Sequence, residues 1–136
     1  MKETWFSLHE LATWPLQMRD IQDAVADYYG IDREMLLAKY RDASLVNVRH
    51  VAVHLCKELT RSSYPAIGRK FNQDHTTIMY ACRRIHERLQ QEPTLRNEIA
   101  AIRGRLDAIL ERRTKYVTDS QDEAAAARGQ SAAEGV

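Results

Sequence analysis

The feature that most constrains the fold is a helical spacing of apolar residues in the middle of the chain. They recur at i, i+3, i+4, i+7, i+8 and i+11, at Val48, Val51, Ala52, Leu55, Cys56 and Leu59. This is the pattern of a helix with one buried stripe. The opposite face of that helix carries His50, His54, Lys57 and Arg61. These four residues are therefore expected to be exposed.

Helical patterns also precede this segment. Apolar residues follow helical spacing from Met18 to Tyr29, and Gly30 can end that helix. Asp32 can cap a short helix behind it. The chain is therefore expected to form an all-α fold, a small helical bundle.

A short helix, a tight turn and a second helix come next. Ser62 or Ser63 can cap the short helix, whose first turn tolerates Pro65. Only "NQ" separates Phe71 from Asp74, which is a suitable N-cap for the following helix. This order of elements is a helix-turn-helix pattern.

The second helix of this pattern separates into a buried and an outward face. The buried stripe consists of Ile78, Cys82, Ile85 and Leu89. The outward face carries Thr77, Tyr80, Arg84 and Arg88. In helix-turn-helix proteins the second helix enters the major groove with its N-terminal residues toward the base edges, while basic residues reach phosphates. Double-stranded DNA is therefore the expected partner.

The charge distribution agrees with a polyanion-binding surface. Residues 39–91 hold ten Lys or Arg against four Asp or Glu, a net charge of +6, although the whole chain carries only +1. Phosphate binding requires local positive charge rather than a high overall pI. An ordinary solvated face is the alternative that charge alone leaves open.

Length and composition exclude several classes of protein. A chain of 136 residues suits one compact domain rather than an enzyme with a separate cofactor domain. No apolar run is long enough to span a membrane, and Glu3, His9 and Glu10 interrupt any signal-peptide pattern. A cytoplasmic, nucleoid-associated protein without membrane contact is expected. Its cysteines, Cys56 and Cys82, are expected to be reduced core thiols.

The run "HLCKELTRSSYPAIGRKFNQDHTTIMYACRRI", from His54 to Ile85, resembles domain IV, the C-terminal DNA-binding domain, of the bacterial replication initiators of the DnaA family. Upstream, "IQDAVADYYGIDREMLLAKYR" is similar to the opening helices of that domain. The resemblance spans roughly residues 18–110. It implies a bundle with a helix-turn-helix that binds short asymmetric A·T-rich boxes as a monomer.

The resemblance also implies a set of DNA contacts. Asp74, His75 and Thr76 match the major-groove base contacts, while Thr77 and Pro65 match positions close to the backbone. The side chains suit these roles, because a carboxylate accepts from cytosine and a threonine methyl packs on thymine. A plain helix cap is the alternative role for Asp74. Further phosphate contacts are expected from Lys57, Arg61, Arg69, Lys70 and Arg84.

The chain departs from the family pattern in four respects. It has no G-x-x-x-x-G-K-[ST] motif and no room for the initiator's ATPase module, so neither nucleotide binding nor ATP-driven origin melting is expected. Ala43 stands where the family has a minor-groove arginine, which leaves Arg41 and Arg49 as loop contacts. The turn before Asp74 is one residue short, and Tyr80 replaces a common histidine. A changed target sequence can follow.

Histidine and cysteine raise the alternative of a metal site. His50 and His54 share one helix face, and Cys82 and His86 repeat the same spacing, so a four-ligand zinc site is conceivable. It is not expected, because Cys82 belongs to a buried stripe and the first two histidines to an exposed face. An enzyme is not expected either, since no nucleophile is oriented beside Asp74 and His75. No cofactor is implied.

The two ends of the chain suggest further contacts. Residues 1–17 form an amphipathic segment, residues 18–92 the DNA-binding domain, residues 93–115 a C-terminal helix and residues 116–136 a disordered tail. The C-terminal helix has a two-heptad seam of Leu95, Ile99, Ile102, Leu106 and Ile109. The seam either packs on the domain or forms a homodimer or a contact with a partner protein. The expected function is control of transcription or of replication initiation, and the alternative is an adaptor that binds through its terminal helices.

Overall fold

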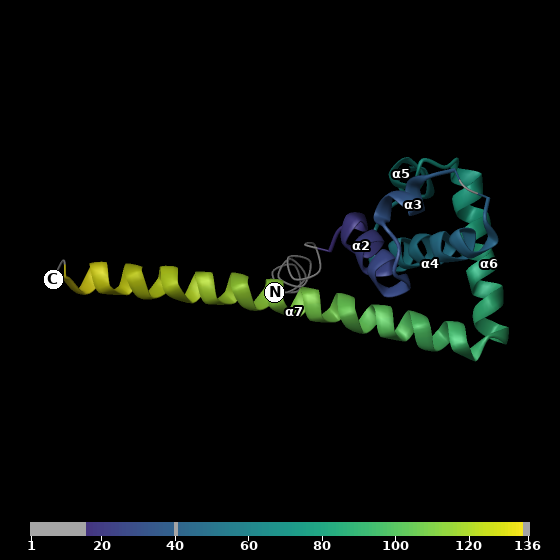
Figure 1. The fold of residues 1–136 in the computed structure, drawn as a ribbon. Coiled ribbons are helices and arrows are strands. Elements are labelled where there is room, and N and C mark those ends of the chain that lie inside the picture. The colour runs from purple at the N-terminus through teal and green to yellow at the C-terminus, as the bar shows by residue number, and fades with distance from the viewer. Residues whose placement is uncertain (1–15, 40, 135–136) are drawn as a thin grey trace. The chain divides into compact units, whose positions relative to one another are not determined.

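The structure, a computed structural model, describes residues 16–39 and 41–134, with side chains for 16–39, 41–113 and 115. Helices are the only regular elements within these residues (Figure 1): α2 (Met18–Tyr29), α3 (Arg33–Leu37), α4 (Ala43–Leu59), α5 (Tyr64–Phe71), α6 (His75–Gln91) and α7 (Pro93–Glu134). The all-α prediction is therefore confirmed. The predicted amphipathic segment, residues 1–17, lies mostly outside the described residues.

Helix α4 is the centre of the domain that extends from Leu16 to Leu106. It contacts α2, α3, α5 and α6, and every residue from Arg49 to Cys56 is buried. His50 and His54 retain only 7% and 6% of their exposure, so the prediction that they are exposed is wrong. The physical reason is that neighbouring helices cover both the apolar stripe and the polar face of α4.

Capping interactions explain where the first helices begin and end. Gly30 adopts a left-handed conformation with φ of 70° and ends α2 as predicted. Asp42 accepts a hydrogen bond from the backbone N–H of Ser44 at 2.9 Å and caps α4. The helix therefore begins at Ala43, so Arg49, which was predicted to be a loop contact, lies inside α4.

The turn between α5 and α6 has little spare room. The Ser63 hydroxyl accepts from the backbone N–H of Ala66 at 3.2 Å and caps α5. Asn72 then reverses the chain in a left-handed conformation with φ of 56°. A Cβ atom at Gly68 would lie 2.5 Å from the carbonyl oxygen of Gln73. Glycine is therefore required for the turn to approach α5 this closely.

The first part of α7 belongs to the domain. Its seam residues Leu95, Ile99, Ile102 and Leu106 are buried there. Glu98 accepts a hydrogen bond from the Tyr29 hydroxyl at 2.8 Å, and Arg103 pairs with Glu58 on α4. For these four seam residues, the predicted packing onto the domain is what the structure contains.

The second part of α7, from Asp107, is a separate unit. Its backbone is helical up to Glu134, whereas the sequence predicted no regular structure after residue 115. Alanine has the highest helix propensity of all residues, and the segment contains the run "AAAA" and no proline. Low complexity here is therefore compatible with a helical backbone.

Candidate nucleic-acid interface

The N-terminus of α6 presents a row of polar side chains. Asp74 occupies the N-cap position, as predicted, yet its carboxylate makes no capping hydrogen bond to the described backbone of α6. Asp74, His75, Thr76 and Thr77 are all exposed. Because neither burial nor capping engages these groups, the carboxylate, the imidazole and both hydroxyls are accessible to a ligand.

A groove of about 780 Å³ lies beside this row, between the start of α6, the turn after α5 and the start of α4. Its lining brings together seven of the predicted contact residues: Arg41, Arg49, Pro65, Arg69, Asp74, His75 and Thr77. Lys39 adds a further positive charge. Residues that are up to 38 positions apart in the sequence, Lys39 and Thr77, therefore form one continuous surface.

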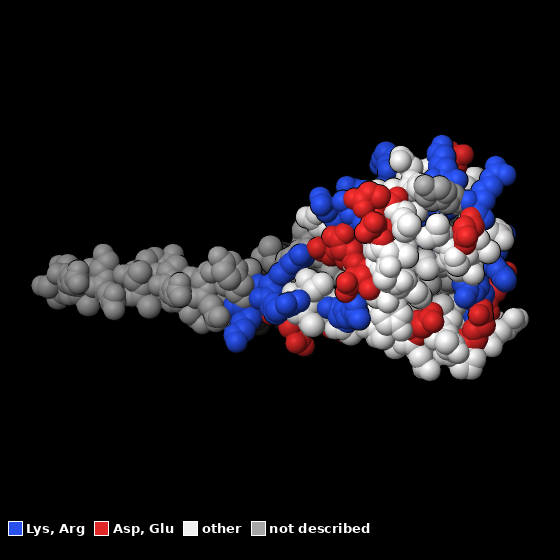
Figure 2. Space-filling view, viewed as in Figure 1, with Lys and Arg blue, Asp and Glu red and all other residues white. Residues whose placement is uncertain are grey.

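Two basic residues project from the last turn of α5. Arg69 and Lys70 are exposed, while the backbone beneath them is anchored. Gln22 of α2, only 2% exposed, donates from Nε2 to the carbonyl oxygen of Lys70 at 3.1 Å. In the view of Figure 2, acidic side chains gather over the region of α2, and Lys and Arg lie over α5 and along α6 among a few acidic side chains. This hydrogen bond holds the backbone from which the two basic side chains project.

Lys57 has a structural contact as well as a positive charge. Its ammonium donates to the carbonyl oxygen of Ser62 at 3.2 Å and lies 4.2 Å from the ring centroid of Tyr64. Both contacts hold the segment between α4 and α5. The half-buried Lys57 therefore supports the start of α5 in addition to its predicted phosphate contact. Arg61 is exposed in the same segment.

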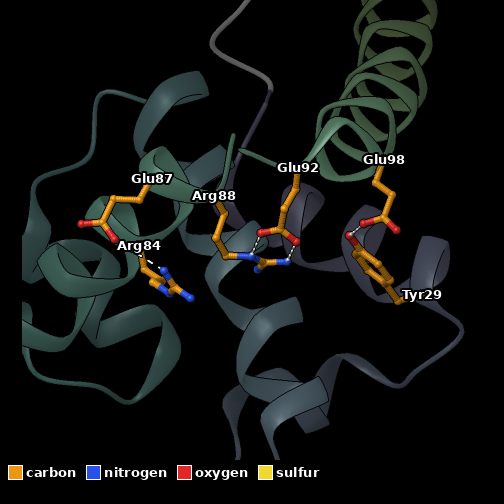
Figure 3. A network of polar contacts seen from close by, with 6 residues as sticks. All are labelled: Tyr29, Arg84, Glu87, Arg88, Glu92 and Glu98. Atoms are coloured by element: carbon orange, nitrogen blue, oxygen red, sulfur yellow. Dashed lines mark hydrogen bonds and ion pairs between the residues drawn. The ribbon is translucent and has the colours of Figure 1, made fainter. Parts of the chain in front are cut away.

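The two arginines of the predicted outward face of α6 differ in environment (Figure 3). Arg84 is 48% exposed and lies 3.5 Å from Glu87. Arg88 is only 16% exposed and donates to Glu92 at 2.7 Å, at the C-terminal end of α6. The resulting charge-assisted hydrogen bond lowers the pKa of the Glu92 carboxyl. Arg84 is thus available to a phosphate, whereas Arg88 joins the end of α6 to the start of α7.

Arg41 and Arg49 also occupy unlike positions. Arg41 is exposed at the rim of the groove. Arg49 is 7% exposed, and its guanidinium donates to the carbonyl oxygens of Leu36 at 2.9 Å and of Ala38. These bonds satisfy carbonyl groups at the end of α3. Arg49 therefore ties α3 to α4, and little of its surface is available to DNA.

His50 forms part of the floor of the same groove. Its ring packs edge to face against Tyr80 with the centroids 5.9 Å apart. Burial, and then the nearby charges of Arg49, Arg88 and Arg84, lower the pKa of His50 to about 4. The imidazole is therefore neutral at physiological pH. Its Nδ1 atom is buried without a hydrogen-bond partner among the described residues.

The order of the helices, the exposed end of α6 and the basic groove are those of a helix-turn-helix domain. The family model described as "Bacterial dnaA protein helix-turn-helix" matches residues 18–85. The chain belongs to the DnaA helix-turn-helix family. This family membership confirms the predicted resemblance to domain IV, a DNA-binding and non-catalytic type of module.

Two DnaA proteins illustrate how far the similarity extends. The chain is 40% identical over 92 residues to the chromosomal replication initiator protein DnaA of a Bradyrhizobium strain, which covers 67% of this chain and 19% of that protein. It is 37% identical over 100 residues to the DnaA of Limosilactobacillus reuteri, covering 73% of this chain and 23% of that protein. The chain thus spans about a fifth of the length of these relatives.

Two further exposed residues on α6 were not singled out as contacts from the sequence. Met79 and Arg83 are exposed and follow Thr76 by three and seven positions, so all three share one helix face. Met79 is 40% exposed although its side chain is apolar. The seven-residue spacing of Arg83 from Thr76 was the signal that could have identified it.

The positions of the cysteines and of the metal-ligating side chains bear on the predicted core thiols and on the alternative of a zinc site. Cys56 is buried and free, as predicted, whereas Cys82 is free but only half-buried. Within the described residues, no three metal-ligating side chains gather in one place.

Among the helices that the structure describes, none combines the length and the apolar character required to cross a lipid bilayer.

Proposed function

We propose that residues 18–92 bind duplex DNA with the N-terminal end of α6 in the major groove, and that the protein controls transcription or replication initiation by occupying specific sites. The observation that carries this proposal is the exposed, uncapped row of Asp74, His75 and Thr76 at the start of the second helix of a DnaA-type helix-turn-helix. A carboxylate, an imidazole and a hydroxyl with its methyl group match the donors, acceptors and thymine methyl of base edges.

Phosphate anchoring is the second part of the proposal. Thr77, Pro65 and Arg69 line the groove beside the base-reading row. Lys57, Arg61, Lys70 and Arg84 would supply the further phosphate contacts. Phosphate contacts orient the protein on the duplex without carrying sequence information. Arg41 extends this surface at the groove rim, in place of the arginine that is absent at Ala43. The protein would then work in the cytoplasm, on the nucleoid.

Two substitutions separate base reading from phosphate anchoring. His75→Ala should lower affinity for the preferred duplex by about 1 to 3 kcal/mol and leave binding to a scrambled duplex nearly unchanged. Lys70→Ala should weaken both duplexes alike and reduce the slope of affinity against salt by about one. Arg19→Ala removes an exposed positive charge on α2 and is the matched control. Equal losses on both duplexes for His75→Ala would refute its base-reading role.

A contact with a second chain is a separate proposal, and it concerns only the end of the seam. Ile109 and Leu110 are half-buried in the unit that begins at Asp107, and they continue the apolar spacing of α7. A homodimer or a partner protein would use this segment, as would an adaptor function. Sedimentation at micromolar concentration tests the homodimer directly, since a strict monomer would end that proposal.

A further inference from the structure

The second turn of α6 carries an exposed apolar surface. Met79 is 40% and Tyr80 is 55% exposed, and among the side chains that the structure describes, Met35 at 39% is the other large apolar residue with such exposure. Met79 and Tyr80 follow Thr76 by three and four positions, so they lie on the same helix face as Thr76. The apolar surface is therefore continuous with the proposed base-reading row.

Tyr80 is held in place from beneath. His50 is 7% exposed and packs edge to face against the Tyr80 ring, at an interplanar angle of 77°. Ordering a side chain on binding costs free energy, and a ring that is already supported loses less freedom than an unsupported one. His50 is thus a positioning residue for Tyr80, whose other surface remains open to the groove.

Positive charge flanks this apolar surface on both sides. Arg69 lines the first groove together with Tyr80, while Lys57 and Arg83 line a second groove together with Met79. Cations on either side of an apolar protein partner would have to be desolvated, whereas phosphates on either side of a DNA groove would neutralise them. The surroundings therefore favour duplex DNA as the occupant.

In the major groove the apolar substituent of a base pair is the C5 methyl group of thymine. We infer that Met79 and Tyr80 are specificity-determining residues that pack on thymine methyl groups beyond the bases contacted by Asp74, His75 and Thr76. This inference rests on the proposed function. It assigns the second turn of α6 to the reading of thymine, in addition to the polar contacts of the first turn.

The test removes single methyl groups from the DNA. A preferred duplex is first selected from a random duplex library with the full chain, and each thymine is then replaced in turn by deoxyuridine. This exchange deletes one methyl group and retains the base pairing and the groove acceptors. Each contacted methyl should contribute about a fourfold change in affinity.

Variants then assign each sensitive thymine to a side chain. Met79→Gln keeps the length of the side chain but makes it polar, and Tyr80→Gln removes the ring. In each variant, deoxyuridine should no longer weaken binding at the thymine that the missing side chain contacts, while sensitivity at the Thr76 position should persist. Met35→Gln, at nearly equal exposure on α3, should behave as the wild type.

The failures of the two ideas can be told apart. Equal binding of all deoxyuridine duplexes by the wild type, or unchanged sensitivity in both Met79→Gln and Tyr80→Gln, would overturn the inference while leaving sequence-specific binding intact. A library that yields no enriched sequence would overturn the proposed function itself, and the inference with it.

Discussion

Arg49 offers a direct test of which arginines bind DNA and which hold the domain together. Its guanidinium donates to the carbonyl oxygens of Leu36 and Ala38 from an almost fully buried position. Hydrogen bonds to charged groups contribute about 1.5 to 3 kcal/mol each. In Arg49→Met the methionine replaces much of the aliphatic packing, and the desolvation of a charge is avoided. The net loss of unfolding free energy should therefore be about 2 to 4 kcal/mol.

The assay measures stability and DNA binding together. Urea unfolding of Arg49→Met should show the lost stability, while the salt dependence of binding, measured where the variant is folded, should stay as in the wild type. Arg41→Met at the exposed groove rim is the matched control, which should keep its stability and reduce the salt slope by about one. Unchanged stability with a reduced salt slope for Arg49→Met would refute the structural role and make Arg49 a phosphate contact.

Three further predictions concern stability. Burial holds the pKa of His50 and of His54 at about 4, below the value of 6.5 in the unfolded chain, so only the unfolded state takes up these protons between the two values. Stability should fall as pH drops from about 6.5 toward 4, by at most about 1.4 kcal/mol per pH unit for each histidine; urea midpoints that do not change between pH 7 and pH 5 would contradict this. Gly68→Ala should cost about 1 to 3 kcal/mol, measured by urea unfolding, because the added Cβ overlaps the carbonyl oxygen of Gln73; a wild-type midpoint would show that the turn can move aside. Asn72→Ala should cost about 1 kcal/mol in a melting experiment, whereas Asn72→Gly should not, because only the alanine is strained at positive φ.

Much of the fold could be predicted where local signals coincide. The bounds Met18–Tyr29 follow from apolar spacing that ends at Gly30, the residue that adopts the left-handed cap. The start of α6 after Asp74 follows from a turn of two residues and from a residue type that favours the N-cap position, which Asp74 occupies without a capping hydrogen bond from its side chain. In both places, backbone conformation and side-chain pattern favour the same boundary, so the prediction did not depend on distant contacts.

The burial of α4 could not be predicted in the same way. An apolar stripe identifies one buried face, but it does not reveal that other helices cover the opposite face as well. His50 and Arg49 are polar yet buried, because tertiary contacts supply a ring partner for one and carbonyl acceptors for the other. Met79 is the converse, an apolar residue that the neighbouring helices leave exposed.

The predicted DNA contacts also divide into those that the local sequence specifies and those that depend on tertiary packing. Asp74, His75 and Thr76 are adjacent in the sequence, so one exposed helix end suffices to bring them together. Asp74 and His75 line one groove with Arg41 and Arg69 only because of the way α4 and α5 pack. Local sequence patterns do not specify that packing.

The central claim is that the exposed start of α6 reads base sequence. The most direct measurement is fluorescence anisotropy of the full chain with a duplex carrying a DnaA-type A·T-rich box and with a scrambled duplex, each at low and near-physiological salt. We predict a preference for the box that survives the added salt, because base contacts with Asp74, His75 and Thr76 do not depend on counterion release as phosphate contacts do. Equal, salt-sensitive binding to both duplexes, or no binding at either salt concentration, would contradict the account if a duplex selected from the random library is also bound no better than its scrambled control.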